Sequence, residues 1–318
     1  MLSRIEVGRS SVLADLVSLT KPRVISLLLV TTIAPMFAAG RDLPPWSLVM
    51  VVALSGYLMA GGANAINMWF DRDIDVRMAR TRLRPVPSGR LPAPAALVFG
   101  IALAATGFWL FWRLVNPLSA WLALGGLLWY VGVYTFWLKR SSPRNIVIGG
   151  AAGAFPALVG WAAVAGRLDL TAIYLFAIIF FWTPPHFWAL ALIKRPEYAK
   201  AGVPMLPVVR GEHRTRLEML TYALLLIPLT LMPVALGTFG WLYAVSAVLL
   251  DMIFLWYCLR LWTPGILPRA WKLYRFSLLY LFLLFLAMPL DRHLAPALGR
   301  ALSDMTHYGW AVPLAFAH

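Results

Sequence analysis

A stripe of three polar side chains ends a long apolar run near position 70. Asn67, Asp71 and Asp75 fall on one face of a helix, because a step of four residues exceeds a full turn by only about 40°. Charges beside so apolar a run are costly unless they bind something. Two carboxylates and an amide offer the oxygen ligands that Mg²⁺ takes together with phosphate oxygens. The stripe therefore predicts one half of a metal–diphosphate clamp.

The segment after the stripe is rich in arginine. Arg80 and Arg84 are also four residues apart, so they could face the same phosphate groups, which guanidinium binds through two parallel hydrogen bonds. Asp73 falls on a different face of the helix. A second interpretation is that the aspartates only pair with neighbouring arginines at a membrane surface. Arg82 and Arg90 fit that plainer role of surface charge.

Composition places these residues in a membrane. The chain of 318 residues is 61% hydrophobic and 13% charged, with 15 tryptophans and a mean hydropathy of +0.76. A soluble globule cannot bury so much apolar surface. The single cysteine, Cys258, excludes an internal disulfide.

Each transmembrane helix needs roughly 20 apolar residues to cross a hydrocarbon core about 30 Å thick. On this measure the sequence predicts an all-α fold, a polytopic membrane bundle of nine transmembrane helices. The predicted spans are 24–40, 47–69, 93–114, 117–138, 146–166, 169–190, 217–237, 240–260 and 273–291. No alternation typical of a membrane β-barrel strand occurs.

The formal net charge of +15 is distributed unevenly between the two sides of this bundle. Most lysines and arginines fall on the side of the N-terminus. The other side holds only Arg41, Arg113, Arg167, Arg292 and Arg300. By the positive-inside rule we expect a cytoplasmic N-terminus and a C-terminus outside, in a bacterial cytoplasmic (inner) membrane. The basic excess thus indicates topology and lipid bilayer contact, with no nucleic acid partner.

Two loops on the expected cytoplasmic side are long, at about 70–92 and 191–216, and long loops in a compact bundle usually carry function. Both contain mixed charge, so we expect the active site at this face. Residues 1–22 lack the continuous apolar stretch of a signal peptide and predict an amphipathic cytoplasmic lead-in. No separate soluble domain fits between the spans, so residues 1–318 are expected to form a single domain.

The stripe, followed by RMARTRLRPVPSG at 77–89, resembles the first aspartate-rich motif of the UbiA-type intramembrane prenyltransferases. Nine spans and long loops after the second and sixth spans are similar to that superfamily along almost the whole chain. The resemblance implies an Mg-dependent prenyltransferase. In such proteins Mg²⁺ holds an isoprenyl diphosphate, which ionises to an allylic cation and passes to an acceptor.

Two further stretches resemble the protoheme IX farnesyltransferases, or heme O synthases: YTFWLKRSSPRNIVIGGAAGAFPALVGW at 134–161 and FWTPPHFWALALIKRPEYAKAGVPMLPVVRG at 181–211. The resemblance implies farnesyl diphosphate as donor and heme b as acceptor. A vinyl group of heme b attacks the farnesyl cation and water captures the resulting carbocation, giving heme O for terminal oxidase biogenesis. Hand-over of the product to heme A synthase or an oxidase assembly factor would fit that family.

One departure concerns the loop after the sixth span. Quinone-type relatives carry two further aspartates four residues apart there, whereas this chain has Glu197 followed by Ala201. Heme O synthases often have two adjacent acids before this tyrosine, and Pro196 takes one of those places. A second metal ion with full acidic coordination is therefore in doubt, and Lys194 could neutralise diphosphate instead.

The candidate site residues form four overlapping groups. The expected catalytic residues are Asn67, Asp71, Asp75, Lys139 and Lys194. The expected metal ligands are Asn67, Asp71, Asp75 and Glu197. The expected diphosphate-binding residues are Lys21, Arg23, Arg80, Arg84, Lys139, Lys194 and Tyr198. The expected heme-binding residues are Arg140, Asn145 and His186, the last as an axial or propionate ligand.

Several of these residues have a structural alternative. Asn145 could simply cap the fifth span, and His186 could be a hydrogen-bonded packing residue. Pro184 and Pro185 predict a kink or opening of the sixth span. The glycine positions 61, 62, 149, 150 and 153 predict close helix packing. Four other histidines are set aside: His213 as solvated, and His293, His307 and His318 as lying outside.

Two rival functions remain at this point. The nearer is a UbiA-type prenyltransferase with an aromatic acceptor, either a quinone precursor or a chlorin. The farther is a heme-handling transporter, since Asp251 lies midway along the eighth span and broken helices with midplane charges are typical of transporters. Neither Asp251 nor the proline pair explains the stripe. The role of Asp251 stays open.

Overall fold

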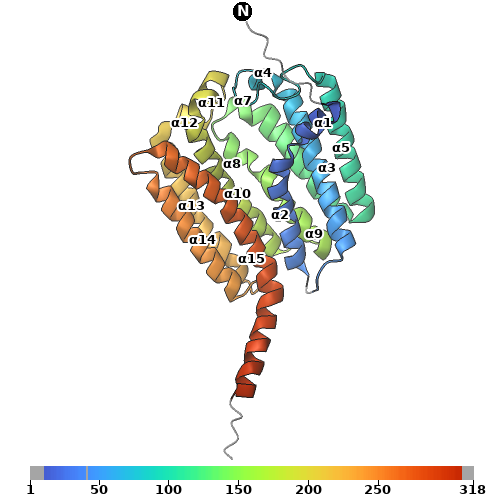
Figure 1. Ribbon diagram of the computed structural model, residues 1–318, viewed down its shortest axis with the longest axis vertical. Coiled ribbons are helices and arrows are strands. Elements are labelled where there is room, and N and C mark those ends of the chain that lie inside the picture. Colours follow the sequence, from blue (N-terminus) through green and yellow to red (C-terminus); the bar gives the residue numbers. More distant parts are fainter. Residues whose placement is uncertain (1–10, 41, 310–318) are drawn as a thin grey trace, which may run out of the picture.

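The computed structural model describes residues 11–40 and 42–309, with side chains through Leu294. All regular structure in these residues is helical, and the helices form one upright bundle (Figure 1). Residues 1–10 of the lead-in, Arg41 and His318, and the side chains of Arg300 and His307, lie outside the described residues. The single-domain organisation stays a prediction.

Nine helical spans among the described residues are long and apolar enough to cross a membrane, which confirms an all-helical integral membrane protein. They are Pro22–Ala39 (α2), Trp46–Phe70 (α3), Ala93–Leu114 (α5), Pro117–Ser141, Asn145–Ala165, Leu170–Ile193 (α10), Gly211–Ala235 (α13), Trp241–Arg260 (α14) and Ile266–Leu294, the last within α15 (Ile266–Gly309). The largest differences from the predicted spans are at Gly211 and Ile266, where each helix begins earlier in a charged segment. Hydropathy marks the apolar part of such a helix and not its polar first turns.

The fourth and fifth spans are each built from shorter pieces. The fourth joins α6 (Pro117–Leu128), a π-helix η1 (Trp129–Leu138) and α7 (Lys139–Ser141). The fifth joins α8 (Asn145–Gly149) to α9 (Ala151–Ala165). A π-helix is rare and adds residues to each turn, so it changes which side chains share a face. By contrast, α10 remains one continuous helix through its proline pair, so the predicted opening there is wrong.

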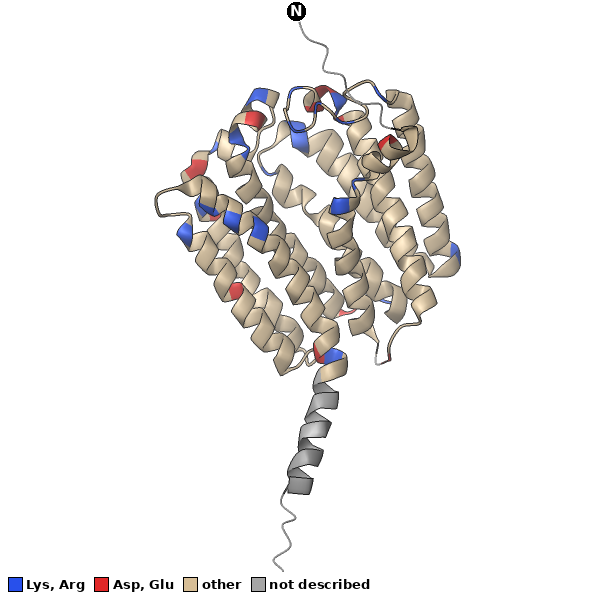
Figure 2. Cartoon of the chain, viewed as in Figure 1, with Lys and Arg blue, Asp and Glu red and all other residues tan. Residues whose placement is uncertain are grey.

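Short helices cover one end of the bundle. They are α1 (Val12–Thr20), α4 (Arg72–Asp75), α11 (Arg195–Ala201) and α12 (Leu206–Val209). The Ser11 side chain accepts a hydrogen bond from the backbone of Ala14 and so caps α1. Lys21 then takes a left-handed conformation, with φ 56°, which ends α1 and lets α2 begin at Pro22 in a new direction. Most Lys and Arg residues lie toward this end (Figure 2), hereafter the charged end.

The first and last spans are neighbours. α2 packs against both α9 and α15, and α15 packs in turn against α10 and α14. Nε2 of His293 on α15 lies 2.7 Å from the carbonyl oxygen of Phe37, in the last turn of α2. The contact between α2 and α15 therefore joins the first span to the last and closes the bundle into a ring.

Glycines bring several helices unusually close. A Cβ at Gly62 would lie 2.5 Å from the carbonyl oxygen of Gly100, and a Cβ at Gly100 would lie 2.9 Å from that of Gly62, so α3 and α5 touch through their backbones. A Cβ at Gly149 or Gly150 would also meet a neighbouring side chain. Gly153 has nothing within 4 Å, so the packing interpretation is wrong at that position.

The contact at Gly160 yields a stability prediction. A Cβ there would lie 1.7 Å from the carbonyl oxygen of Thr32, which is backbone and cannot turn aside. Gly160→Ala should force α2 and α9 apart and cost about 1–3 kcal/mol. Thermal unfolding of the detergent-solubilised protein measures this. Gly153→Ala, in the same helix with open space around it, is the matched control, and equal melting temperatures for the two variants would contradict the packing argument.

Candidate active site

The stripe of polar side chains continues past the end of α3 into α4. The amides of Asp71 and Asp75 donate to the carbonyls four residues earlier, at 2.9 and 2.8 Å, so the helical path continues into α4. Asn67, Asp71 and Asp75 are 4%, 0% and 2% exposed. Nδ2 of Asn67 donates to Oδ2 of Asp71 at 2.7 Å. The three side chains thus form one buried, connected row below the charged end.

Each member of the row is held by a cation from another segment. Lys139 pairs with Asp71, Nη1 of Arg84 lies 2.7 Å from Oδ2 of Asp75, and Nζ of Lys21 donates to Oδ1 of Asn67 at 3.0 Å. We call these six residues the clamp. Its cations come from η1 and α7, from the loop after α4 and from the junction of α1 with α2. Segments far apart in the sequence therefore meet at the stripe.

The clamp holds more positive than negative charge. Burial, together with the positive charges of Arg84 and Lys139, lowers the pKa of Lys21 to about 7. Oδ1 of Asp71 is buried and makes no hydrogen bond among the described residues, although Arg140 lies 3.7 Å from it. The site thus offers clustered cations and a carboxylate oxygen with a free lone pair. Both are suited to an anion that arrives with a metal ion.

Asp73 lies apart from the clamp, as its position on another helix face predicts. Arg140 binds both of its carboxylate oxygens at 2.8 Å and stacks over Phe70. The hydrogen bonds from Arg140 hold the pKa of Asp73 below its usual value. The aspartates therefore do form ion pairs. Apart from Arg84, however, the partners are Lys139 and Arg140 at the end of the fourth span and not the arginines next to the stripe.

The second long loop lies against the first. Nζ of Lys194 lies 2.8 Å from Oε1 of Glu197, whose other oxygen is buried without a hydrogen bond in the described part of the chain. Tyr198 is 8% exposed. Burial and Tyr134 raise the pKa of Tyr198, while Arg80 and Lys139 act in the opposite direction. Tyr198 is thus within electrostatic reach of the clamp, and Glu197 has an oxygen available for a ligand.

The three candidate heme-binding residues share no hydrogen bond. Arg140 is engaged at the rim with Asp73, and Nδ1 of His186 lies 2.7 Å from Oγ of Ser277 on α15. Asn145 is the first residue of α8 and its side chain caps nothing, so its interpretation as an N-cap is wrong. Its side chain is fully buried, and neither amide atom has a hydrogen-bond partner among the described residues.

Known proteins resemble this chain in sequence and in fold. Residues 27–287 match the UbiA prenyltransferase family. The chain belongs to this family. Two curated relatives, both called protoheme IX farnesyltransferase, come from Roseiflexus sp. (strain RS-1) and Symbiobacterium thermophilum. The first is 54% identical over 90% of this chain and 53% of its own length, and the second is 52% identical over 91% and 96%. The chain thus spans about half the length of the Roseiflexus relative.

Solved structures share the fold of this UbiA-family protein. A digeranylgeranylglyceryl phosphate synthase has a TM-score of 0.73 at 20% identity, covering 88% of this chain and 98% of that one. A UbiA homolog from Archaeoglobus fulgidus, bound to GPP and Mg²⁺, has a TM-score of 0.64 at 17% identity, covering 86% and 99%. At such identities the likeness shows the fold alone.

Two contacts near the UbiA-family site, those of Thr135 and Arg90, were not predicted from the sequence. Thr135 accepts a hydrogen bond from Asn67 at 3.1 Å, four residues before Lys139, so the fourth span contacts the stripe twice. The only signal was that spacing of four, matching Asn67 and Asp71. Arg90, interpreted as surface charge, binds Asp15 of α1 at 3.0 Å and so fastens the first loop to the lead-in helix.

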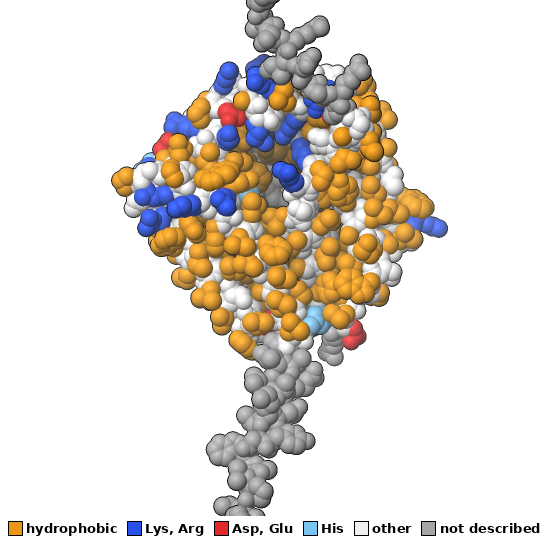
Figure 3. Space-filling view, in the orientation of Figure 1, with side chains coloured by type: hydrophobic (Ala, Val, Ile, Leu, Met, Phe, Trp, Pro, Cys, Tyr) orange, Lys and Arg blue, Asp and Glu red, His pale blue; other side chains and the backbone are white. Residues whose placement is uncertain are grey.

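A hollow opens below the charged end. Figure 3 shows it on the face where α2 and α15 stand in front, with Lys and Arg side chains around its upper rim and hydrophobic side chains below. This arrangement suits a ligand with a charged end and an apolar body. The hollow lies on the same side of the bundle as the clamp-bearing loops.

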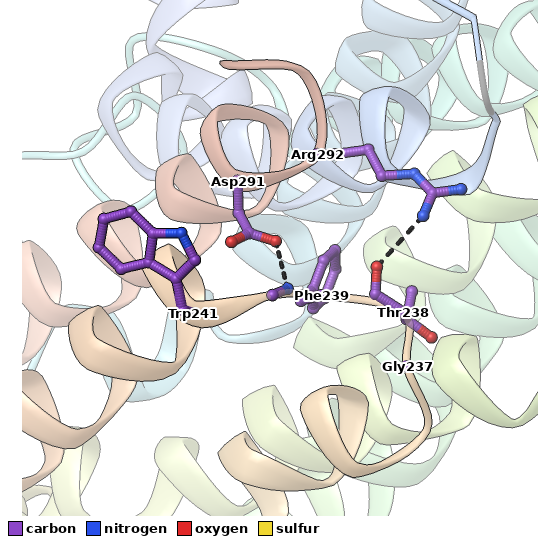
Figure 4. A pocket seen from close by; sticks show the side chains of 7 residues that line it. Gly237, Thr238, Phe239, Trp241, Asp291 and Arg292 are labelled. Atoms are coloured by element: carbon purple, nitrogen blue, oxygen red, sulfur yellow. Dashed lines mark hydrogen bonds between the residues drawn. The ribbon is translucent and has the colours of Figure 1, made fainter. Parts of the chain in front are cut away.

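Two polar groups away from this end have structural partners. Asp251 lies 2.6 Å from both Oγ1 of Thr230 and the hydroxyl of Tyr280, so it ties α13, α14 and α15 together. A pocket of about 390 Å³ at the opposite end contains Asp291 (Figure 4). Its carboxylate accepts from the amides of Gly240 and Tyr243 and thereby caps α14.

The pairing of Asp71 with Lys139 can be tested without any ligand. Lys139→Met leaves the buried carboxylate with the hydrogen bond from Asn67 and, as its only cation, the more distant Arg140, which should cost about 3 kcal/mol of stability. Adding Asp71→Asn to that variant should recover most of the loss, because the unpaired charge is gone. Chemical unfolding followed by tryptophan fluorescence measures all four corners of the cycle. Strictly additive losses would show that the two side chains are not coupled.

Proposed function

We propose that this protein transfers a farnesyl group from farnesyl diphosphate to a vinyl group of heme b, with addition of water, giving heme O. The observation that carries the proposal is the 52% identity to a protoheme IX farnesyltransferase along 96% of that relative's length. The clamp and the hollow support it, because they offer cations for a diphosphate and apolar walls for a prenyl chain.

The residues of the clamp fit a divalent metal ion. No group of three or more His, Cys, Asp or Glu that could hold a metal occurs in the described part of the chain. Mg²⁺ does not require one, because it binds through one or two carboxylates, waters and substrate phosphate oxygens. Asp71, whose Oδ1 makes no hydrogen bond, and Asp75 would supply the carboxylates, with Asn67 beside them and Glu197 from the second loop. When bound, Mg²⁺ would neutralise charge on the departing diphosphate.

The cations of the clamp have two roles in this proposal. Paired with the stripe, they keep two buried carboxylates neutralised. With a diphosphate present, Lys139, Arg84 and Lys21 would turn to its oxygens and stabilise the charge that grows as the C–O bond breaks. Lys194, Arg80 and Tyr198 would close over the same group from the two loops.

The apolar hollow would serve the second half of the reaction. The new bond joins C1 of the farnesyl cation to the terminal vinyl carbon, and water then adds to the neighbouring carbon with loss of a proton. Walls that exclude water protect the cation until the vinyl group reaches it. Arg140 and Asn145 would contact the heme propionates. The positive-inside rule directs this end to the cytoplasm of a bacterial inner membrane.

The proposal predicts a defined product. Incubating the membrane-embedded protein with heme b, farnesyl diphosphate and Mg²⁺ should give a heme heavier by one farnesyl group and one hydroxyl group, detected by mass spectrometry of the extracted heme. EDTA or Asp71→Asn should abolish it. Unmodified heme from demonstrably folded protein would contradict the choice of acceptor, and formation of a prenylated aromatic acid would then support the quinone-type alternative.

Arg84 should contribute to donor binding in particular. Loss of a charged hydrogen bond to phosphate in Arg84→Gln should raise the KM for farnesyl diphosphate about tenfold and leave the KM for heme unchanged. Arg82→Gln is the matched control, since Arg82 belongs to the same segment but its side chain is exposed. Equal effects of the two variants on both substrates would contradict the assignment of Arg84 to the clamp.

A further inference from the structure

His186 makes an unusual hydrogen-bonding arrangement with α15. Its Nδ1 lies 2.7 Å from Oγ of Ser277, and the same Oγ lies 2.7 Å from the carbonyl oxygen of Tyr274. Ser277 is fully buried and His186 is 6% exposed. Both short contacts must therefore be hydrogen bonds, because two buried acceptor atoms at that distance without a hydrogen between them repel each other.

A serine hydroxyl has a single hydrogen, and a carbonyl oxygen can only accept. Ser277 must therefore donate its hydrogen to Tyr274 and accept from Nδ1 of His186. The proton of the neutral imidazole is thus fixed on Nδ1, which leaves Nε2 with a lone pair. A doubly protonated ring would need an acceptor for Nε2–H, and no described residue provides one.

Nε2 is also reachable. It makes no hydrogen bond among the described residues, yet it is not one of the polar atoms that are sealed inside the protein without a partner. The neighbouring Thr183 packs against Gly150 at the start of α9, while Ser277 lies on α15. His186 therefore lies on α10 where this helix packs against both α15 and the fifth span.

Two aromatic rings hold the imidazole plane in place. The ring of Trp182 stacks on His186 with centroids 4.4 Å apart, and that of Tyr274 stacks at 4.9 Å. Nε1 of Trp182 also donates to the carbonyl oxygen of Ser277 at 3.0 Å. Successive turns of α10 thus dock on the same residue of α15, so the imidazole can neither rotate nor exchange its two nitrogens without breaking these contacts.

We propose that Nε2 of His186 is an axial ligand to the iron of the heme substrate and that Ser277 is the residue that positions it. This rests on the proposed function, which supplies heme as the acceptor. Histidines that bind metals nearly always donate the other ring N–H to an oxygen, which fixes tautomer and orientation. A propionate contact would require an N–H at Nε2, and the hydrogen bond to Ser277 places the proton on the other nitrogen. His186 lies about 12 Å, two helical turns, from Lys194 along α10.

The test compares hemin with protoporphyrin IX, which has the same ring, vinyl groups and propionates but no iron. Both are titrated into the full-length protein in detergent. His186→Gln should weaken hemin binding at least about tenfold, alter the Soret band and the electron paramagnetic resonance spectrum, and leave protoporphyrin IX binding unchanged. Equal loss of affinity for the two compounds would assign His186 to a propionate or to packing and overturn the proposal.

Two further variants keep the test decisive if the glutamine variant folds poorly. His186→Gly should lose the histidine-ligated spectrum, and added imidazole should restore it. Ser277→Ala should keep ligation but weaken hemin binding about tenfold, again without effect on protoporphyrin IX. His213→Gln, which changes a histidine packed against Trp262 in the second loop, is the matched control and should match the unaltered protein. No rescue by imidazole would contradict ligation.

These readouts separate the inference from the proposed function. If the unaltered protein binds hemin with a His186-dependent spectrum but makes no farnesylated heme, the acceptor chemistry fails and the ligand assignment stands. If it farnesylates heme while its spectrum is insensitive to His186, the reaction stands and the ligand assignment fails.

Discussion

The structure depends on neutralising two carboxylates that are buried where a transmembrane helix ends. Asp71 and Asp75 are almost inaccessible, and isolated charges in such a place would cost several kcal/mol each. Lys139 and Arg84 offset that cost. Lys139 comes from the end of the fourth span, and Arg84 comes from the loop after α4. These pairs therefore fix where the fourth span and the first loop lie relative to the stripe, and the rim of the hollow follows from that placement.

Local backbone irregularities also bring cations to the buried carboxylates. The π-helix η1 brings Thr135 and Lys139 to the same side, against Asn67 and Asp71. The left-handed conformation of Lys21, an unusual one for a residue with a side chain, turns its ammonium toward Asn67 while α1 stays at the charged end. Irregular backbone is concentrated where it supports the site, whereas the tight contacts between α3 and α5 and between α2 and α9 are regular helices separated only by glycine.

Much of this could be predicted from sequence because it depends on composition and period. Hydropathy located the nine spans, and the spacing of four placed Asn67, Asp71 and Asp75 on one face while excluding Asp73. Pairings across elements could not be predicted in this way. Nothing local to Asn145 distinguishes a buried unpartnered amide from a helix cap, and nothing near His186 points to Ser277, which lies 91 residues away. Likewise, Arg90 appeared to be surface charge until Asp15 was seen beside it.

The neighbouring position of the first and last spans has a consequence for biogenesis. The stripe and its cations are complete once the fourth span has been synthesised, but α15 supplies Ser277, one side of the hollow and the contact between His293 and Phe37. α2 must therefore remain in the bilayer without its final neighbour until the ribosome has delivered the ninth span. A chain released before that point would carry the charged residues of the site inside an unclosed ring, exposed to lipid and to quality-control proteases.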